Sequence, residues 1–266
     1  MSQQIEKLEE IFNAEANREL KVNLIMDAGE IIIKKSDSSL SGMAKFYYSK
    51  EGYEAACRYD KSFSSLHAEI KKREWLPWRK NVYREDEISK IEILLPTGVL
   101  SRLKIKNRTG DVSLDLGGLK LRELYISSWS SNVDMNFSSP NGTKLEILEL
   151  NVRKGSLKIN NFGNAKYELA EINLNIGTIL LDLSGENIES SRLNLDLDLG
   201  TTEITIPEDI GVELYISKFL FLTNVKIPGG MRRMGTRWIS INYEESTKKL
   251  MLNISSGAGG VKINFR

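Results

Sequence analysis

Three segments decide the fold: 148-LELNVRKGSLKI-159, 170-AEINLNIGTILL-181 and 193-LNLDLDLGTTEI-204. Each contains one glycine, and apolar residues alternate with other residues on both sides of it. The apolar residues stand at odd distances before the glycine and at even distances after it. Alternation with a period of two is typical of strands that bury one face. The change of parity predicts that the glycine, which tolerates a positive φ, forms a corner between two short strands.

This unit recurs at a nearly constant spacing along most of the chain. The hinge positions are Gly110, Ser131, Gly155, Gly177 and Gly200, with successive spacings of 21, 24, 22 and 23 residues. Further copies centre on Gly29 and Gly259. One unit is too short to bury its apolar face alone, but a stack of units buries a continuous column. The repeat therefore predicts an all-β fold, a parallel single-chain β-solenoid (β-helix-like) in which each copy is one rung.

Aligning the copies on their hinges predicts which side chains point inward. The residues four after the hinge are Leu114, Met135, Ile159, Leu181 and Ile204, and those five before it are Ile105, Ile126, Leu150, Ile172 and Leu195. The column six after the hinge contains Asn161 among Leu116, Phe137, Leu183 and Ile206. The column five after the hinge is polar: Asp115, Asn136, Asn160, Asp182, Thr205 and Asn264. Calcium-binding solenoids use a Gly-rich nonapeptide repeat, so we interpret this polar column as an outward, solvated ladder.

The two ends of such a stack expose unpaired strand edges and need capping β segments. We expect residues 1–90 to form an N-terminal β cap contiguous with the first rung. Residues 91–266 are expected to hold the β-solenoid repeats and C-terminal capping strands. Residues 1–20 fit either a short amphipathic helix or an irregular strand. Near the other end, residues 211–224 are typical of a strand, and Pro228-Gly229-Gly230 is typical of a turn.

The composition excludes several kinds of chemistry. The chain has 37 basic and 36 acidic residues, a net charge of +1, so no overall field draws nucleic acid or an acidic membrane. Cys57 is the single cysteine and His67 the single histidine, so neither an intrachain disulfide nor a Cys/His zinc site can be assembled. We interpret Cys57 as a small buried residue and His67 as structural or solvent-exposed. The residues predict no cofactor and no metal.

Three stretches carry a resemblance to a known family: residues 27–33, the hinge repeats of 103–206, and the ending 235–243 with 250–263. They resemble the toast-rack family (DUF2154- and DUF4097-like), bacterial envelope domains related to the C-terminal domain of the antibiotic-response protein LiaF and to adhesin-like proteins. The resemblance implies an extracytoplasmic location, yet the sequence shows neither a signal peptide nor an apolar run long enough to span a membrane. We expect the targeting or anchor segment to lie outside this sequence, and a cytoplasmic location is the alternative.

Two stretches that mix tryptophan with basic residues are candidate contact surfaces. In residues 73–80, Trp75 and Trp78 can stack on a carbohydrate or a lipid headgroup, with Arg79 and Lys80 beside them. The alternative is a loop whose tryptophans cover the open end of the stack. In residues 231–238, basic residues precede Trp238, and we interpret this stretch as a solvated turn beside a packed indole.

Acidic residues occur throughout the repeats: Asp115, Asp134, Asp182, Asp196 and Asp198. General acid–base catalysis needs two carboxyl groups that converge in a cleft, and no long insertion is available here to wall one. We therefore expect no catalytic residue, and a non-enzymatic binding or scaffold module of the cell envelope whose partner is an envelope protein or a polysaccharide. Two alternatives stay open: a regulatory domain in envelope-stress signalling that binds a membrane partner, and a carbohydrate-active β-helix enzyme.

Overall fold

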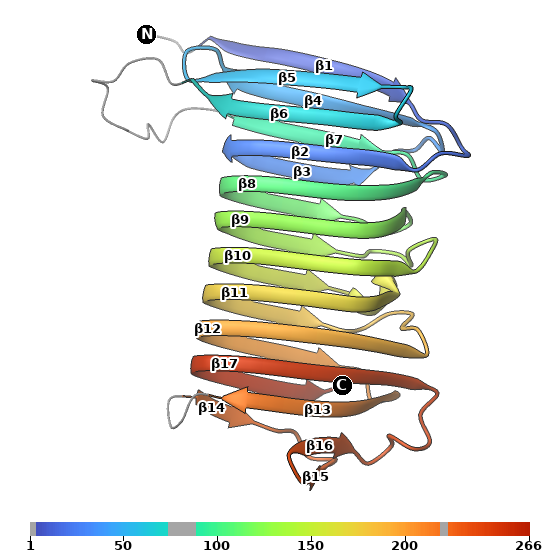
Figure 1. Cartoon of the computed structure of the whole chain (residues 1–266), viewed down its shortest axis with the longest axis vertical. Helices are drawn as coiled ribbons and strands as arrows, with labels where there is room; N and C mark the ends of the chain where they lie inside the picture. The colour runs from blue at the N-terminus through green and yellow to red at the C-terminus, as the bar shows by residue number, and fades with distance from the viewer. Residues whose placement is uncertain (1–3, 74–88, 219–222) are drawn as a thin grey trace.

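The structure, a computed structural model, describes residues 4–73, 89–218 and 223–266. Its strands form one continuous stack of layers, with β1 and β5 at one end and β15 and β16 at the other (Figure 1). The predicted all-β solenoid is confirmed. Long strands in parallel register make up the middle of the stack, and shorter, partly antiparallel strands close its two ends.

The central layers are long strands that each bend once. They are β8 (Leu100–Asp115), β9 (Lys120–Asn136), β10 (Leu145–Asn160), β11 (Tyr167–Asp182), β12 (Ser190–Ile206) and β17 (Lys248–Phe265). The N-terminal strands are β1 (Ile5–Asn13), β2 (Leu20–Ala28), β3 (Glu30–Lys35), β4 (Ser41–Ser49), β5 (Tyr53–Asp60), β6 (Ser65–Lys72) and β7 (Ser89–Leu95). The remaining elements are the short helix η1 (Phe162–Ala165) and the strands β13 (Ile210–Lys218), β14 (Thr223–Lys226), β15 (Met231–Met234) and β16 (Arg237–Ser240).

The hinge positions align from layer to layer, as the repeat predicts. Gly155 is opposite Ser131 on one side and Gly177 on the other, and Gly200 is opposite Gly177 and Gly259. The inward columns are buried throughout: Leu114, Met135, Ile159, Leu181 and Ile204 are at most 3% exposed. The two arms of each layer thus enclose one continuous aliphatic core between them.

The hinge requires glycine for two reasons, best seen at Gly177. Its φ is +149°, a conformation that residues with a Cβ rarely adopt. A Cβ built at this position would also lie only 1.7 Å from the carbonyl oxygen of Gly155 in the layer before it. Ser131 occupies the hinge of β9 without a positive φ, so this one layer turns its corner differently.

At the N-terminal end, the layers do not follow the order of the chain. β2 and β3 pair with β8 on one side, and with β6 and β7 respectively on the other. The later segments β6 and β7 therefore form the layer outside β2 and β3. β5 pairs antiparallel with β6, β4 with β7 and β1 with β4, which covers this end. Residues 5–13 accordingly form a strand, the second of the two alternatives, because β1 supplies the partner that the edge of β4 needs.

The C-terminal end is also out of chain order. β17 is the last strand, yet it lies between β12 and the layer made by β13 and β14 (Figure 1). The hairpin of β15 and β16 then pairs with β13 through β16. The strand predicted for residues 211–224 is present as β13 and β14, and residues 219–222 between them lie outside the described residues. At each end of the stack, layers that are adjacent in space therefore come from segments that are separated in the chain.

Two expectations about the columns need correction. The polar column five after the hinge is half-buried rather than fully solvated, because its side chains bind the turns that follow the strands. Asp115 Oδ1 accepts the backbone amide of Gly117 at 3.2 Å, and Asp182 Oδ1 accepts that of Ser184 at 3.0 Å. Asn161 does not point into the core: it has a φ of +51° and immediately precedes η1, and the next residue, Phe162, is fully buried instead.

Candidate contact surface

The sequence-predicted contact residues Trp75, Trp78, Arg79 and Lys80 lie outside the described residues. In the chain they belong to the connection between β6 and β7, which together form one layer. Their role as a contact surface stays a prediction.

A different surface of mixed aromatic and basic side chains lies at the hinge corner. We call it the Trp129 corner and define it as Arg108, Thr109, Trp129, Ser130 and Arg153. The parallel register brings Arg108 of β8, Trp129 of β9 and Arg153 of β10 side by side, each two residues before its hinge. At this distance from the hinge the strand alternation directs side chains outward, so all three are exposed.

The indole of Trp129 is 60% exposed, although tryptophan is usually largely buried. The guanidinium carbon of Arg153 lies 4.2 Å from the centroid of the ring, so one face of the indole is covered by a cation. Such a cation–π contact contributes about 0.5–1 kcal/mol at an exposed site and so favours this orientation of the ring. The indole therefore stands out from the surface in an orientation that Arg153 stabilises.

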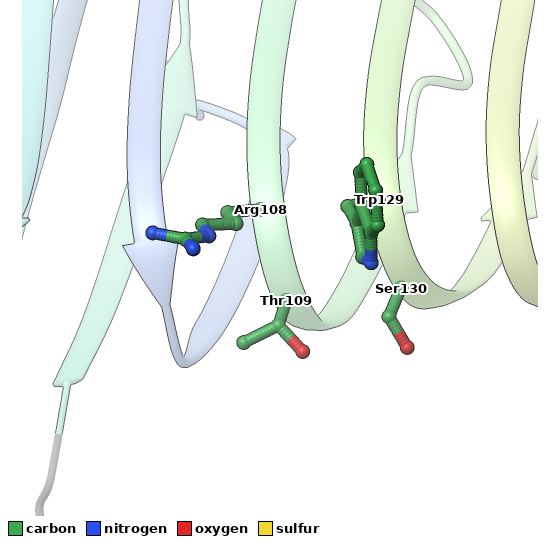
Figure 2. A pocket seen from close by; sticks show the side chains of 4 residues that line it. All are labelled: Arg108, Thr109, Trp129 and Ser130. Atoms are coloured by element: carbon green, nitrogen blue, oxygen red, sulfur yellow. The ribbon is translucent and has the colours of Figure 1, made fainter. Parts of the chain in front are cut away.

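A hollow of about 540 Å³ adjoins the indole and is lined by Arg108, Thr109, Trp129 and Ser130. Figure 2 shows the indole edge-on, with the guanidinium of Arg108 reaching away from it over the neighbouring layer. The hydroxyl-bearing side chains of Thr109 and Ser130 line the hollow beside them (Figure 2). The hollow thus combines a flat aromatic surface, a cation and two hydroxyl groups.

The basic character continues from this corner along the outer face of β8. Lys104, Lys106 and Arg108 are all exposed and alternate along the strand. None of the three has a carboxylate partner among the residues that the structure describes. Some exposed cations elsewhere in the stack are paired, such as Lys144 with Glu168 at 3.0 Å, while others, such as Lys154, have no carboxylate partner among the described residues. Unpaired cations on β8 are therefore free to meet an anionic ligand.

Buried polar residues lie directly beneath the Trp129 corner. Ser131, the hinge residue of β9, is 4% exposed, and its hydroxyl group is 2.5 Å from that of Ser128. Asn107 donates to the same Ser131 oxygen from β8 at 2.9 Å. In the following layers Val152, Leu174 and Leu197 are buried three residues before the hinge, as Asn107 and Ser128 are here. The corner that carries Trp129 therefore differs inside from the layers β10, β11 and β12, whereas β17 again buries a serine, Ser256, three residues before its hinge.

A second, larger hollow of about 1050 Å³ lies along the starts of β10, β11 and β12. Its charged side chains are largely paired with one another. Lys144 Nζ lies 3.0 Å from Glu168, and Lys166 Nζ lies 3.0 Å from Glu186. These lysines are already matched by carboxylates, whereas Arg192 of the same hollow has no carboxylate partner among the described residues.

At the C-terminal end, a carboxylate fastens the hairpin of β15 and β16. The side chain of Glu213, 9% exposed, binds Arg237 and accepts the hydroxyl of Tyr215 at 2.8 Å and that of Tyr243 at 3.3 Å. Burial alone would raise the pKa of Glu213, but the bonds from Tyr215 and Arg237 hold that pKa below its ordinary value. Trp238 packs partly buried against the core, as expected of an indole beside a solvated turn.

Neither His67 nor Cys57, the two other residues that the sequence analysis considered, is placed as a reactive group. His67 is exposed on β6, with Nε2 3.8 Å from Glu69. Cys57 is only partly buried, but burial and, after it, the charge of Glu10 raise the pKa of its thiol to about 12. The thiol therefore stays protonated at neutral pH, and a protonated thiol is a poor nucleophile.

Four of the five aspartates singled out in the repeats contact other groups of the chain, and the fifth, Asp196, has no hydrogen bond or ion pair among the described residues. Asp115 and Asp182 hold turn amides, as described above. Asp134 lies 3.8 Å from Lys158, and Asp198 accepts the side-chain amide of Asn175 at 2.7 Å. Within residues 4–73, 89–218 and 223–266, no three metal-binding side chains are grouped. Among the same residues there is no helix with the length and apolarity needed to cross a bilayer.

Sequence reasoning missed Trp129 although a signal was present. In the columns aligned on the hinges, position 129 falls on the outward side of the alternation, where the neighbouring copies have Arg108, Arg153 and Asn175. A lone tryptophan in an outward column is unusual because burying it would be favourable. What could not be read from the sequence is that Arg153 stacks on it.

The chain is similar to several known proteins. Among solved structures, the chain is similar to a "putative cell adhesion protein" from Clostridium sporogenes, at 19% identity and a TM-score of 0.47, covering 98% of this chain and 100% of that chain. It is also similar to a "putative adhesin" from Bacteroides fragilis, at 13% identity and a TM-score of 0.46, covering 97% of each chain. No curated protein matches. Residues 1–155, more than half of the chain, match the N-terminal domain of toast_rack, DUF2154, and the chain belongs to this family.

Proposed function

We propose that this chain is a non-enzymatic binding or scaffold module of the cell envelope, exposed outside the cytoplasm, that binds through the outer surface of its layers. The exposed indole of Trp129, with the guanidinium carbon of Arg153 stacked 4.2 Å from its centroid, carries the proposal. An exposed, ordered aromatic side chain is a typical anchor for a binding partner. The envelope location rests on the resemblance of the repeats and the ending to toast-rack domains.

The scaffold supports binding because it is rigid where the contact surface lies. β8, β9 and β10 each pair with a neighbour on both sides along nearly their whole length. Side chains on such a surface lose little backbone freedom when a ligand binds, so less binding energy is spent on ordering the protein. Asp115, Asp134, Asp182 and Asp198, in contrast, hold turns or neighbouring side chains, which does not favour a catalytic pair.

The test is co-sedimentation of the purified chain with isolated cell-wall sacculi and, separately, with envelope membrane vesicles. We expect the chain to sediment with the wall and to release no soluble sugar from it. Sedimentation with protein-containing vesicles but not with protein-free lipid vesicles would favour the envelope-stress alternative, in which a membrane protein is the partner. Release of reducing sugar during the incubation would favour the enzyme alternative. Failure to bind either material would overturn the proposal.

A further inference from the structure

We propose that the Trp129 corner binds an acidic polysaccharide, with a sugar ring stacked on the free face of Trp129 and its acidic group bound by Arg108. This inference rests on the proposed function and specifies its ligand. One face of the indole is covered by Arg153, and the other adjoins the hollow of about 540 Å³. The C–H groups on the face of a sugar ring have a partial positive charge, which matches the negative face of an aromatic ring.

The cations without a carboxylate partner indicate that the ligand has an acidic group. Arg108 lines the hollow and is exposed, and a guanidinium binds a carboxylate or a phosphate through two parallel hydrogen bonds. Asp27 lies opposite Arg108 in β2, but no ion pair joins the two side chains, and Asp27 Oδ2 accepts the backbone amide of Lys72 at 2.9 Å. Thr109 and Ser130 supply hydroxyl groups at the edge of the same hollow for hydrogen bonds with the sugar.

A polymer rather than a single sugar fits the basic strand. Lys106 and Lys104 follow Arg108 along the exposed face of β8, and alternate residues of a strand are about 6.7 Å apart. A chain that lies along β8 therefore meets a cation at regular intervals after its first sugar stacks on Trp129. This arrangement favours an acidic group on successive sugar units.

Single-stranded nucleic acid is the competing polyanion that also stacks on aromatic rings. Proteins that bind it present aromatic side chains for successive bases within a strongly basic groove. Here one tryptophan, Trp129, is exposed beside the basic face of β8, and the net charge of the whole chain is +1. The observations therefore favour a sugar polymer, and an oligonucleotide serves as a competitor in the test.

The experiment is calorimetric titration of the full chain with polygalacturonate, which has carboxylates, and with a phosphorylated mannan. These two probes distinguish the two sources of the acidic group. Neutral dextran, polyglutamate and oligo-dT are the controls for charge, sugar and nucleic acid. We expect one or both acidic glycans to bind, and Trp129→Ala and Arg108→Ala each to weaken binding at least about tenfold. Trp129→Phe, which keeps a ring, should retain most of the affinity.

Matched controls are Phe63→Ala and Arg58→Ala, because Phe63 is 72% exposed and the Arg58 side chain 82% exposed, both far from β9 in the register. They should bind like the original chain, and circular dichroism should show every variant folded. The inference is wrong if neither acidic glycan binds, if dextran, polyglutamate or oligo-dT binds equally well, or if Trp129→Ala binds unchanged. If Trp129→Ala still sediments with sacculi as the original chain does, the ligand site is wrong and the proposed function stands.

Discussion

The hinges of successive layers form one corner of the stack, and its two halves follow a similar backbone course but present different outward side chains. In the half made by β8, β9 and β10, the outward residues are Arg108, Trp129 and Arg153. In the half made by β11 and β12, the same columns contain Asn175 and Asp198, which hydrogen-bond at 2.7 Å, with Ile176 and Leu199 exposed beside them. We call these four residues the Asp198 corner.

The difference shows which positions the fold constrains. Apart from the serine hinge of β9 and the buried Asn107 and Ser128 beside it, the inward columns and hinges are alike in both halves, because every layer must fill the same core. Outward columns change from cationic and aromatic to amide and acidic within a few layers. A residue that no packing or backbone requirement explains is therefore a better guide to binding than one that repeats.

The largest effect tests whether inward and outward positions are as distinct as this comparison requires. Leu181 is 3% exposed, and the adjacent Leu180 is 41% exposed on the other side of β11. We expect Leu181→Asp to lower the free energy of unfolding by at least about 3 kcal/mol, because it buries an unpaired charge. Leu180→Asp should stay within about 0.5 kcal/mol of the original chain. Equal losses in denaturant titrations of the two variants would contradict the register.

The hinge itself gives the next effect. Gly177→Ala places a Cβ in a strained conformation against the carbonyl oxygen of Gly155, and we expect a loss of about 1–3 kcal/mol. Gly229→Ala is the matched control, since no atom lies within 4 Å of the added carbon. Thermal unfolding measures both, and a Gly177→Ala variant as stable as Gly229→Ala would show that the hinge relaxes without cost.

A smaller effect is expected when the buried carboxylate of Glu213 is compared with the exposed carboxylate of Asp198. The lowered pKa of Glu213 means that its charged form is favoured in the folded chain. This stabilisation is present above the ordinary carboxyl pKa of 4.5 and is lost as the pH falls through the lower, folded pKa. Glu213→Gln should remove on the order of 1.5 kcal/mol at pH 7 and flatten the stability profile below pH 4.5. Asp198→Asn, at an exposed site, should change stability at pH 7 by less than about 0.5 kcal/mol.

The smallest effect sharpens the difference between the two corners. Arg153→Ala removes the cation from the Trp129 face, which should cost about 0.5–1 kcal/mol. It should also make Trp129 fluorescence easier to quench with acrylamide, once the signal of Trp129→Ala is subtracted from each sample. Lys154→Ala, the exposed neighbour, should leave quenching unchanged. No change with Arg153→Ala would show that the indole is not held by this contact.

Much of the stack could be predicted because its signals are local. The alternation and the hinge glycines predicted the parallel register and the buried columns. Asn161 was misassigned because a helical turn begins there, and the column rule assumes that strands continue. The out-of-order layers at both ends could not be predicted, because similar apolar columns recur in every copy and do not specify which copies are adjacent. Trp129 was visible as an outward tryptophan, but its stacking partner comes from a different copy of the repeat.

By itself, the sequence determined that the chain folds as layers, where each layer bends and which side chains point inward, because strand alternation and glycine conformations depend on neighbouring residues. The tertiary structure alone decided that β17 inserts between β12 and β13, and that Arg153 rather than Arg108 stacks on Trp129. Those arrangements depend on which layers are adjacent in space. Adjacency is set by the packing free energy of the whole stack, which no single repeat contains.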